Sequence, residues 1–289
     1  MNDKVIYICA DDYGLCSAAS SRIQNCIDEG GLNKASIFPN FDKVDIAKIS
    51  QNKKVYLSLH LNLVEGKCMA NPAKVNLLAD KCGVFSNTFT GLLFLSLLRK
   101  KEFEKQVYKE IQAQVLFWKS ILPQDALFFV DSHQHTHMIP SVFSALLQVL
   151  KDEKIKPEYI RIPAEPLSPY IKTPSLYLTY NCVNIVKQWL LKFLWFINKQ
   201  KPEIVQFQTA YFFGILFSGK MDEKRVNKIL PKYITLAEKH NKDIEVLLHP
   251  GYIQDDEYDY KNTVFKKFYQ SDGRKTEFNT AMKISAKEV

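Results

Sequence analysis

The chain has 289 residues, 46% of them hydrophobic and 24% charged, which is the length and composition of a globular protein with a large core. Its formal net charge is +8, and most of the positive charge comes from lysines scattered along the chain. Because there is no arginine-rich tract, helix-turn-helix pattern or zinc-finger spacing, we expect no nucleic-acid partner.

Short apolar runs predict strands at residues 5–10, 34–38, 55–59, 126–130, 159–162 and 243–248. Helical patterns between and after them cover residues 17–29, 44–49, 92–121, 141–150 and 222–240, and a closing helix starts near residue 274. Because the strands are apolar throughout and alternate with helices, the pattern predicts an α/β fold with a parallel sheet covered by helices. We expect one domain over residues 1–289, with an apolar insertion around 164–201 and a polar tail from about 252.

The cysteines and the N-terminus both bear on the cellular location. None of the six cysteines forms a C-x-x-C pair, and Cys9 lies inside an apolar strand-like run. This usage is typical of a reducing compartment. The chain runs from Met1 directly into a strand without a signal peptide, so we expect it in the cytoplasm.

The strongly apolar stretch at residues 176–197 is the least conventional part of the chain. Lys187 and Lys192 interrupt it, so it lacks the roughly 18 charge-free residues of a membrane-spanning helix. Its apolar residues cover more than one helix face and must therefore pack against something. Two interpretations stay open, a buried or homodimer-forming helix and a helix that lies on a membrane surface.

Acidic and imidazole side chains follow the predicted strands. They are Asp11 and Asp12, His60, the run 131–137 and His249, while Arg161 lies within a strand near its end. Carboxyl ends of parallel strands share one face of a sheet or barrel, and that face carries the site. One such residue alone is more often a cap or a structural histidine. The coincidence over four strands predicts a functional site.

Two imidazoles and one carboxylate with open positions describe a catalytic divalent-metal site. Such a metal activates water, a second carboxylate can take the proton from that water, and a distant imidazole can protonate the leaving group. Together these groups hydrolyse an amide or an ester. The sequence has no G-x-S-x-G elbow, P-loop or G-x-G-x-x-G, so serine hydrolases, P-loop NTPases and Rossmann dehydrogenases are not indicated.

Four motifs resemble those of the YdjC/ChbG-type carbohydrate deacetylases: ADDYG at 10–14, LHLNL at 59–63, DSHQHTH at 131–137 and HPG at 249–251. The resemblance covers roughly residues 4 to 280. It implies a single distorted, TIM-like (β/α) barrel. It also implies that the chain removes an acetyl group from an N-acetylated sugar, with a divalent metal.

The resemblance also implies roles for single residues. It makes Asp12, His60 and His133 the metal ligands, Asp11 the general base and His249 the general acid. The remaining expectations concern residues around this set, with Arg161 orienting Asp11 or the substrate, Asp131 hydrogen-bonding within the site, and His135 and His137 either contacting substrate or packing.

The metal and the substrate stay open at this point. The resemblance suggests Mg²⁺, whereas paired imidazoles suit Zn²⁺, Co²⁺ or Ni²⁺ better. The substrate is either an oligosaccharide or a lipid-linked amino sugar, since the apolar stretch 176–197 and the positive charge would suit a location at the inner membrane face. The alternatives are another metal-dependent hydrolase on the same barrel, such as a phosphoesterase or amidohydrolase, and a catalytically inactive peripheral membrane protein.

Overall fold

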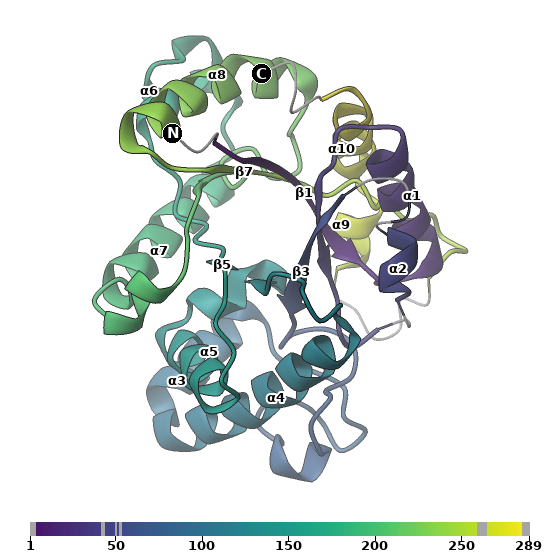
Figure 1. Ribbon diagram of the computed structural model, residues 1–289, viewed down its shortest axis with the longest axis vertical. Helices are drawn as coiled ribbons and strands as arrows, with labels where there is room; N and C mark the ends of the chain where they lie inside the picture. Colours follow the sequence, from purple (N-terminus) through teal and green to yellow (C-terminus); the bar gives the residue numbers. More distant parts are fainter. Residues whose placement is uncertain (1–3, 42–43, 50, 52–53, 259–264, 285–289) are drawn as a thin grey trace.

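The computed structural model describes residues 4–41, 44–49, 51, 54–258 and 265–284. In these residues a single curled sheet holds seven strands, all parallel (Figure 1). They are β1 Ile6–Tyr13, β2 Lys34–Ile37, β3 Tyr56–Leu61, β4 Phe129–Ser132, β5 Tyr159–Ile160, β6 Tyr211–Phe213 and β7 Ile244–Leu248. Their order is β5-β4-β3-β2-β1-β7-β6, and an isolated parallel bridge between Tyr159 and Gln208 links the two edges. The predicted α/β barrel of parallel strands is therefore confirmed.

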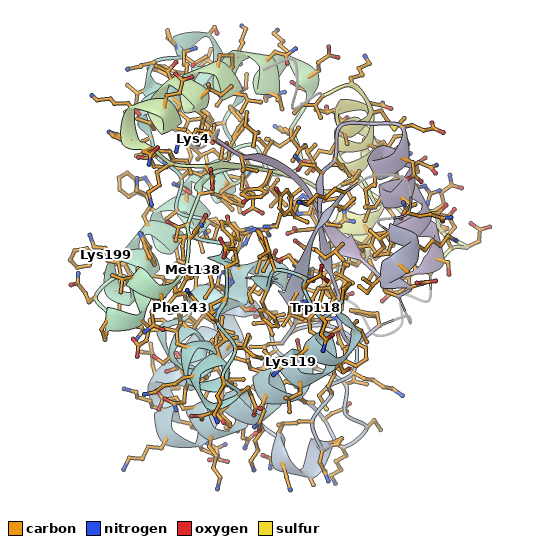
Figure 2. The ribbon with its side chains drawn as sticks, in the orientation of Figure 1. Lys4, Trp118, Lys119, Met138, Phe143 and Lys199 are labelled. Carbon is orange, nitrogen blue, oxygen red and sulfur yellow. The ribbon has the colours of Figure 1, made fainter. Side chains whose placement is uncertain are left out.

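Helices surround the curled sheet on its outer side (Figure 1). The α-helices are α1 Ser17–Asp28, α2 Ile46–Ile49, α3 Phe89–Leu98, α4 Lys100–Ile121, α5 Pro140–Asp152, α6 Ser168–Ile171, α7 Cys182–Asn198, α8 Glu223–His240, α9 Lys266–Tyr269 and α10 Asp272–Lys283. The 3-10 helices are η1 Pro72–Lys74, η2 His133–Met138, η3 Pro174–Thr179 and η4 Pro202–Gln206. Trp118 of α4 is fully buried, whereas Lys119 beside it is exposed (Figure 2).

Three predicted elements differ from the structure. The single helix expected over residues 92–121 is wrong, because Arg99 has non-helical backbone angles (φ −127°, ψ 40°) and separates α3 from α4. The stretch 176–197 is likewise divided, into η3 and α7, around Tyr180 and Asn181. Strand β6 lies in an aromatic run that the sequence left unassigned.

The side chains inside the sheet form layers, because alternate residues of each strand point to the same face. At the amino ends, the rings of Tyr7, Tyr56, Phe129 and Tyr159 pack with centroid separations from 5.0 to 5.8 Å. Next comes a fully buried ion pair, Lys34 Nζ to Glu245 Oε1, at 2.9 Å. The layer at the carboxyl ends is polar and holds the candidate site, including Asp11, His60, Asp131 and Arg161.

Candidate active site

A cavity of about 430 Å³ opens at the carboxyl ends of the strands. Asp11, Asp12, His133, His135 and His249 line its polar side. The rest of the lining is Phe89, Gln134, Val183, Val186, Lys187, Leu190, Leu191, Ser218, Phe265 and Phe268. The structure thus brings the motif residues of strands β1, β4 and β7 to one hollow, as their positions after strands predict.

An irregularity in β1 lets two adjacent carboxylates reach this cavity. In a regular strand, neighbouring side chains point to opposite faces. Here the β1–β2 register shifts between Ala10 and Tyr13, and Asp12 has a positive φ of 72°. Aspartate tolerates this left-handed conformation better than most residues. Asp11 and Asp12 therefore both line the same hollow.

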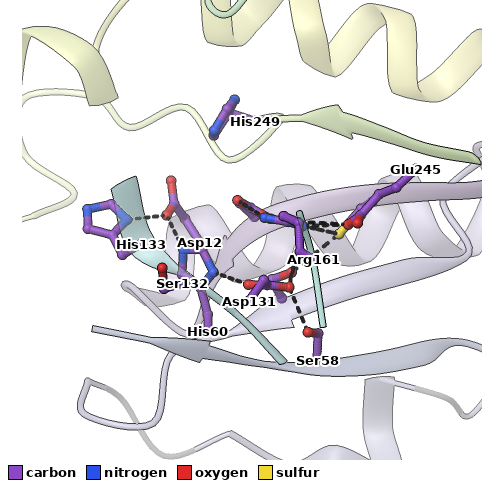
Figure 3. Close-up of polar contacts among 12 residues, drawn as sticks. Asp12, Ser58, His60, Asp131, Ser132, His133, Arg161, Glu245 and His249 are labelled. Carbon is purple, nitrogen blue, oxygen red and sulfur yellow. Dashed lines mark hydrogen bonds and ion pairs between the residues drawn. The ribbon is translucent and has the colours of Figure 1, made fainter. Parts of the chain in front are cut away.

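Asp12, His60 and His133 form a compact set of potential metal ligands (Figure 3). One ligand atom from each lies within 4.8 Å of the others, and all three side chains are buried. Asp12 Oδ1 is 3.5 Å from His60 Nε2 and 3.2 Å from His133 Nδ1. Two ligands on one ion with bonds of about 2.1 Å would be separated by roughly these distances.

His60 is oriented by Asp131, its register partner on β4. Asp131 Oδ1 accepts a hydrogen bond from His60 Nδ1 at 2.5 Å, which leaves Nε2 facing Asp12. Asp131 Oδ2 accepts from the hydroxyls of Ser36 and Ser58, each at 2.6 Å. Burial opposes ionisation of Asp131, but Arg161 and His60 outweigh it and hold the pKa of Asp131 well below its usual range. Metal-binding histidines are commonly fixed by such a carboxylate.

The carboxylates around His60 and Asp12 stay charged although they are buried. Burial would raise the pKa of Asp12, but Arg274, His133 and His60 hold it well below its usual value. Burial would lower the pKa of His60, yet Asp11, Asp12 and Asp131 raise it to about 10. These carboxylates therefore favour a positive charge at His60, whether that charge is a proton or a metal ion.

Two residues that the sequence did not point to complete the surroundings of Asp12 and His133. The Arg274 guanidinium of α10 donates to Asp12 Oδ2 and to the carbonyl oxygen of Gly251, the latter at 2.8 Å. Glu65 Oε2 lies 3.4 Å from His133 Nε2 and accepts a hydrogen bond from Tyr269. The raised pKa of His133 reflects Asp12 and Glu65, which outweigh its burial.

Asp11 has a different partner from its neighbour. Arg161 binds it bidentately, with Nη1 donating to Oδ2 at 2.8 Å and Nη2 to Oδ1 at 2.9 Å. Arg161 also donates to Glu245 Oε1 from Nε at 2.9 Å. Arg161 is fully buried and absent from the cavity lining, so its contacts orient Asp11 and do not reach a bound substrate.

His249 follows β7 and is paired with Glu277 of α10. Glu277 Oε2 lies 3.1 Å from His249 Nδ1 and accepts the backbone N–H of His249 at 2.6 Å. Glu277 Oε1 accepts the backbone N–H of Gly219 at 2.9 Å, so the carboxylate is fixed on both sides. The His249 side chain is 13% exposed, and its ring packs on Phe268. Its Nε2 is therefore available to the cavity.

The two remaining histidines of the run 131–137 differ from each other. His135 lines the cavity, packs on Phe212, and has a pKa well below its usual value because of burial and the nearby Lys187. His137 is outside the cavity lining, and Ser132 Oγ and the Arg161 carbonyl oxygen bind its two nitrogens at 2.5 and 2.8 Å. His137 therefore has contacts of a structural residue, and burial lowers its pKa to about 4.

The site fits a divalent cation by the chemistry of its unsatisfied atoms. Asp12 Oδ1 and His60 Nε2, which lie 3.5 Å apart, are both buried and make no hydrogen bond within the described chain. Such orphaned atoms are costly unless a ligand satisfies them. Asp11, His60 and Asp131 form a second potential ligand set, but both oxygens of each of its carboxylates already have hydrogen-bond partners, whereas Asp12 Oδ1 has none. Asp12, His60 and His133 fit better.

Sequence reasoning missed Glu65, Glu245, Tyr269, Arg274 and Glu277, all of which are buried at or below the site. Glu65 follows the LHLNL motif within a loop, and the other four stand in otherwise ordinary strand or helix patterns. One weak signal was available. The tail after residue 252 holds an arginine and a glutamate three positions apart, Arg274 and Glu277, on one side of its closing helix.

Comparison with known proteins gives a consistent picture. A profile of the family described as YdjC-like protein matches residues 5–289. A solved structure from Enterococcus faecalis V583, of a protein described as a candidate for cellobiose-phosphate cleavage, has a TM-score of 0.60 and 16% sequence identity. That match covers 99% of this chain and 97% of the other, and at this identity it shows the fold alone.

Several curated relatives carry the name carbohydrate deacetylase. Those from Danio rerio and Xenopus laevis are 29% and 27% identical over 164 residues, which is 56% and 55% of this chain. The alignments span 50% and 51% of those relatives, so this chain matches about half of their length. One from Clostridium beijerinckii is 25% identical over 193 residues, covering 64% of this chain and 73% of that protein.

Proposed function

Because this chain belongs to the YdjC-like protein family, we propose that it is a hydrolase that uses a divalent metal to remove the acetyl group from an N-acetylated sugar. The main support for this proposal is the geometry of one cavity, in which the Asp12–His60–His133 ligand set lies beside Asp11 and His249. The name that the curated relatives share supports an acetylated carbohydrate as the substrate class.

The proposed roles follow from the partners of each side chain. When bound by Asp12, His60 and His133, a divalent metal would supply a Lewis acid that polarises the acetyl carbonyl and makes water more acidic. Asp11 accepts the proton of the attacking water, since Arg161 holds its carboxylate at the cavity wall. Arg161 binds both oxygens of Asp11 in charge-assisted hydrogen bonds, which fixes the direction of the carboxylate.

The leaving amine needs a proton, and His249 is placed to donate it. Glu277 binds Nδ1 of His249, which sets the ring orientation and leaves Nε2 toward the cavity. The same carboxylate accepts the backbone N–H of His249, which fixes the position of the residue. We therefore assign the general acid to His249 and the orientation of its ring to Glu277.

The identity of the metal follows from the donor set only in part. Two imidazoles and one carboxylate favour Zn²⁺, Co²⁺ or Ni²⁺, while the family resemblance suggests Mg²⁺. Plasma mass spectrometry of protein purified without added metal distinguishes a bound transition metal from Mg²⁺. A stoichiometric transition metal would overturn Mg²⁺, and its absence together with activation by Mg²⁺ would support it.

Acetate release from a panel of N-acetylated mono- and oligosaccharides tests the proposed reaction. We expect stoichiometric acetate and free amine from at least one sugar, and a rate lower by a factor of about 10² or more with the Asp11→Asn variant. A phosphate ester should be assayed alongside as the competing substrate class. If the protein releases phosphate from the ester but no acetate from any acetylated sugar, it is a phosphoesterase and the proposed deacetylation is wrong.

The proposed setting is a single domain in the cytoplasm, on the sequence grounds given above. In the part of the chain that the structure describes, no helix is both long and apolar enough to cross a membrane. Localisation of a tagged chain by fractionation tests this setting, and recovery outside the cytoplasm and its membrane face would contradict it.

A further inference from the structure

Helix α7 exposes apolar side chains on its outer face. Its buried residues include two polar ones, Gln188 and Asn198, whose amides bind the backbone carbonyls of Glu165 and Met138 at 2.8 Å. The outward face is apolar, with Val183 71%, Val186 68%, Trp189 59%, Phe193 61% and Phe196 59% exposed. A helix that buries amides and exposes aromatic rings has an unpartnered face.

Helix α3, whose first residue lines the same cavity, also exposes apolar side chains. Phe94, Leu97 and Leu98 are 64%, 71% and 80% exposed. Phe89, the first residue of α3, lines the cavity opposite residues of α7. We call the exposed apolar side chains of the two helices the apolar rim: Phe94, Leu97, Leu98, Val183, Val186, Trp189, Phe193 and Phe196.

The apolar rim continues into the active-site cavity. Val183 and Val186 belong to the rim and also line the cavity, and behind them Leu190 and Leu191 extend the apolar wall inward. A second apolar hollow of about 180 Å³ adjoins Trp189 on the same helix. An apolar path therefore connects the exposed face of α7 with the site that holds Asp11 and Asp12.

Basic side chains outnumber acidic ones beside the apolar rim. Lys192 Nζ lies 6.0 Å from the Trp189 ring centroid and Lys199 Nζ lies 5.0 Å from that of Phe196, at the outer end of α7 (Figure 2). Neither α3 nor α7 contains an acidic residue. Arg99, Lys100 and Lys101 follow directly after α3, where Glu102 pairs with Arg99 and Glu104 with Lys100. Aromatic rings beside lysines are typical of a surface that meets anionic lipid headgroups.

We propose that the apolar rim docks on an anionic lipid bilayer and that the acetylated sugar reaches the cavity while attached to a lipid of that bilayer. The rim of a second copy would bring the same lysines and no acidic groups of α3 or α7, so like charges disfavour a dimer through this face. The proposed docking is argued only from the residues of the apolar rim. The proposal that the substrate is attached to a lipid depends in addition on the proposed deacetylation.

Flotation of the purified full chain with vesicles tests the docking. We expect it to float with vesicles of phosphatidylcholine containing about one third phosphatidylglycerol, and to float less with phosphatidylcholine alone. Phe193→Glu puts a negative charge on the rim outside the cavity lining, and we expect about a tenfold or greater loss of vesicle binding. A wild-type chain that stays at the bottom of the gradient overturns the proposal.

A matched control uses an exposed apolar residue at the opposite end of the barrel. Leu127 is 50% exposed and lies just before β4, by a hollow that also contains Tyr7 and Tyr56 from the amino ends of their strands. Leu127→Glu should float like the wild type. Equal losses in both variants would show general destabilisation or a charge effect, and would contradict a specific docking face.

Two further readouts separate this proposal from the proposed reaction. Phe193→Glu should keep the wild-type rate of acetate release from a water-soluble acetylated sugar, and should lose rate on an acetylated amino-sugar lipid embedded in vesicles. If the wild type released acetate from neither substrate, the proposed reaction would be contradicted. Flotation would still decide whether the protein docks on the bilayer. Light scattering measures whether the wild type is a dimer and the Phe193→Glu variant a monomer. That result would overturn bilayer docking and show that the apolar rim is a dimer interface.

Discussion

Asp11 and Asp12 are neighbours in the sequence but belong to different hydrogen-bond networks. Arg161 binds Asp11 from below the cavity, whereas Arg274 binds Asp12 from α10. The left-handed backbone at Asp12 separates their directions, and only Asp12 faces His60 and His133. This separation is the physical basis for giving one carboxylate to the proton and the other to the metal.

Substitution of these two aspartates tests the division of labour. Asp11→Asn should lower the rate of acetate release by a factor of about 10² or more, because a general base is lost, while bound metal stays at the wild-type level. Asp12→Asn should lose both activity and metal. Metal content measured by plasma mass spectrometry beside activity checks this, and loss of metal in Asp11→Asn alone would mean that the roles are reversed.

Glu277 acts through His249, so its substitution should affect turnover more than binding. Glu277→Gln replaces the carboxylate that binds His249 Nδ1 with an amide of the same shape. We expect kcat to fall by about tenfold or more with little change in KM, because proton donation to the amine is impaired. An unchanged kcat, with the fold intact by circular dichroism, would exclude the proposed orientation of His249.

Glu245 gives the protein a predictable acid sensitivity. Its burial opposes ionisation, but Arg161 and Lys34 lower its pKa to about 2, from an ordinary value of 4.5. A depressed pKa stabilises the folded state above pH 4.5, and this contribution is lost as the pH falls toward 2. The wild-type free energy of unfolding should therefore fall over that window more steeply than that of Glu245→Gln.

Urea titrations at pH 7 and at several values below 4.5 measure this difference. The variant should be less stable at pH 7, because the buried Arg161 and Lys34 lose a charged partner, and the gap should narrow with acid. Glu238→Gln on the exposed end of α8 is the control and should follow the wild type. A constant gap across the pH range would contradict the account.

The sequence predicted the residues that follow strands but not those that support them. Asp11, Asp12, His133 and His249 were recognised because each stands at a strand end, and the structure brings all four to one cavity. Arg274 and Glu277 act on these residues from a distant helix. Their contacts depend on how α10 packs, which no local pattern encodes.

At the scale of elements, α10 is the helix that completes the site. It packs on α1 and β7 and carries Arg274 and Glu277 to Asp12 and His249. The sequence suggested a polar tail with a closing helix from about residue 274, and the helix in fact begins at Asp272. Its function was invisible because its few buried residues, chiefly Arg274, Glu277 and Thr280, are polar.

A glycine sets the distance between α1 and α10. Gly31 donates its N–H to Ala281 O at 2.9 Å, and a Cβ at Gly31 would lie 1.6 Å from Ile284 O. Gly31→Ala should therefore displace α10, lower the free energy of unfolding by about 1–3 kcal/mol and reduce activity as well. Gly91→Ala in α3 is the control, because a Cβ there would lie no closer than 3.3 Å to its nearest neighbours, which are side-chain atoms of Asn87 and Thr88.

Thermal and urea unfolding together with acetate release check the effect of Gly31→Ala. Activity should fall in Gly31→Ala even at temperatures where the chain is fully folded, because Glu277 and Arg274 move with α10. Gly91→Ala should keep wild-type activity on a soluble substrate. A folded Gly31→Ala protein with full activity would show that the site does not depend on the position of α10.

Helix boundaries near the cavity were the hardest elements to predict. Residues 92–121 have one continuous helical pattern, and no glycine or proline marks the break at Arg99. Tertiary packing decides it, since α3 turns to place Phe89 at the cavity while α4 packs along α5. Local helix propensity therefore cannot predict that residues 92–121 form two helices and not one.

At the scale of the whole molecule, the alternation of apolar strands and helices predicted parallel strands covered by helices, and the family resemblance implied that these strands form a barrel. Seven parallel strands curl so that their carboxyl ends face one cavity, and the bridge between Tyr159 and Gln208 links the open edges. Strand β6 escaped prediction because its three residues lie inside a longer aromatic run. The apolar rim lies beside the same cavity, so fold, site and surface share one end of the molecule.

The most direct test of the account is acetate release by chelator-treated protein as a divalent metal is added back. The arrangement of Asp12, His60 and His133 predicts no activity without metal, and saturable recovery at one metal ion per chain. Full acetate release by the metal-free protein would contradict the account, and so would a metal-loaded protein that releases no acetate from any N-acetylated sugar.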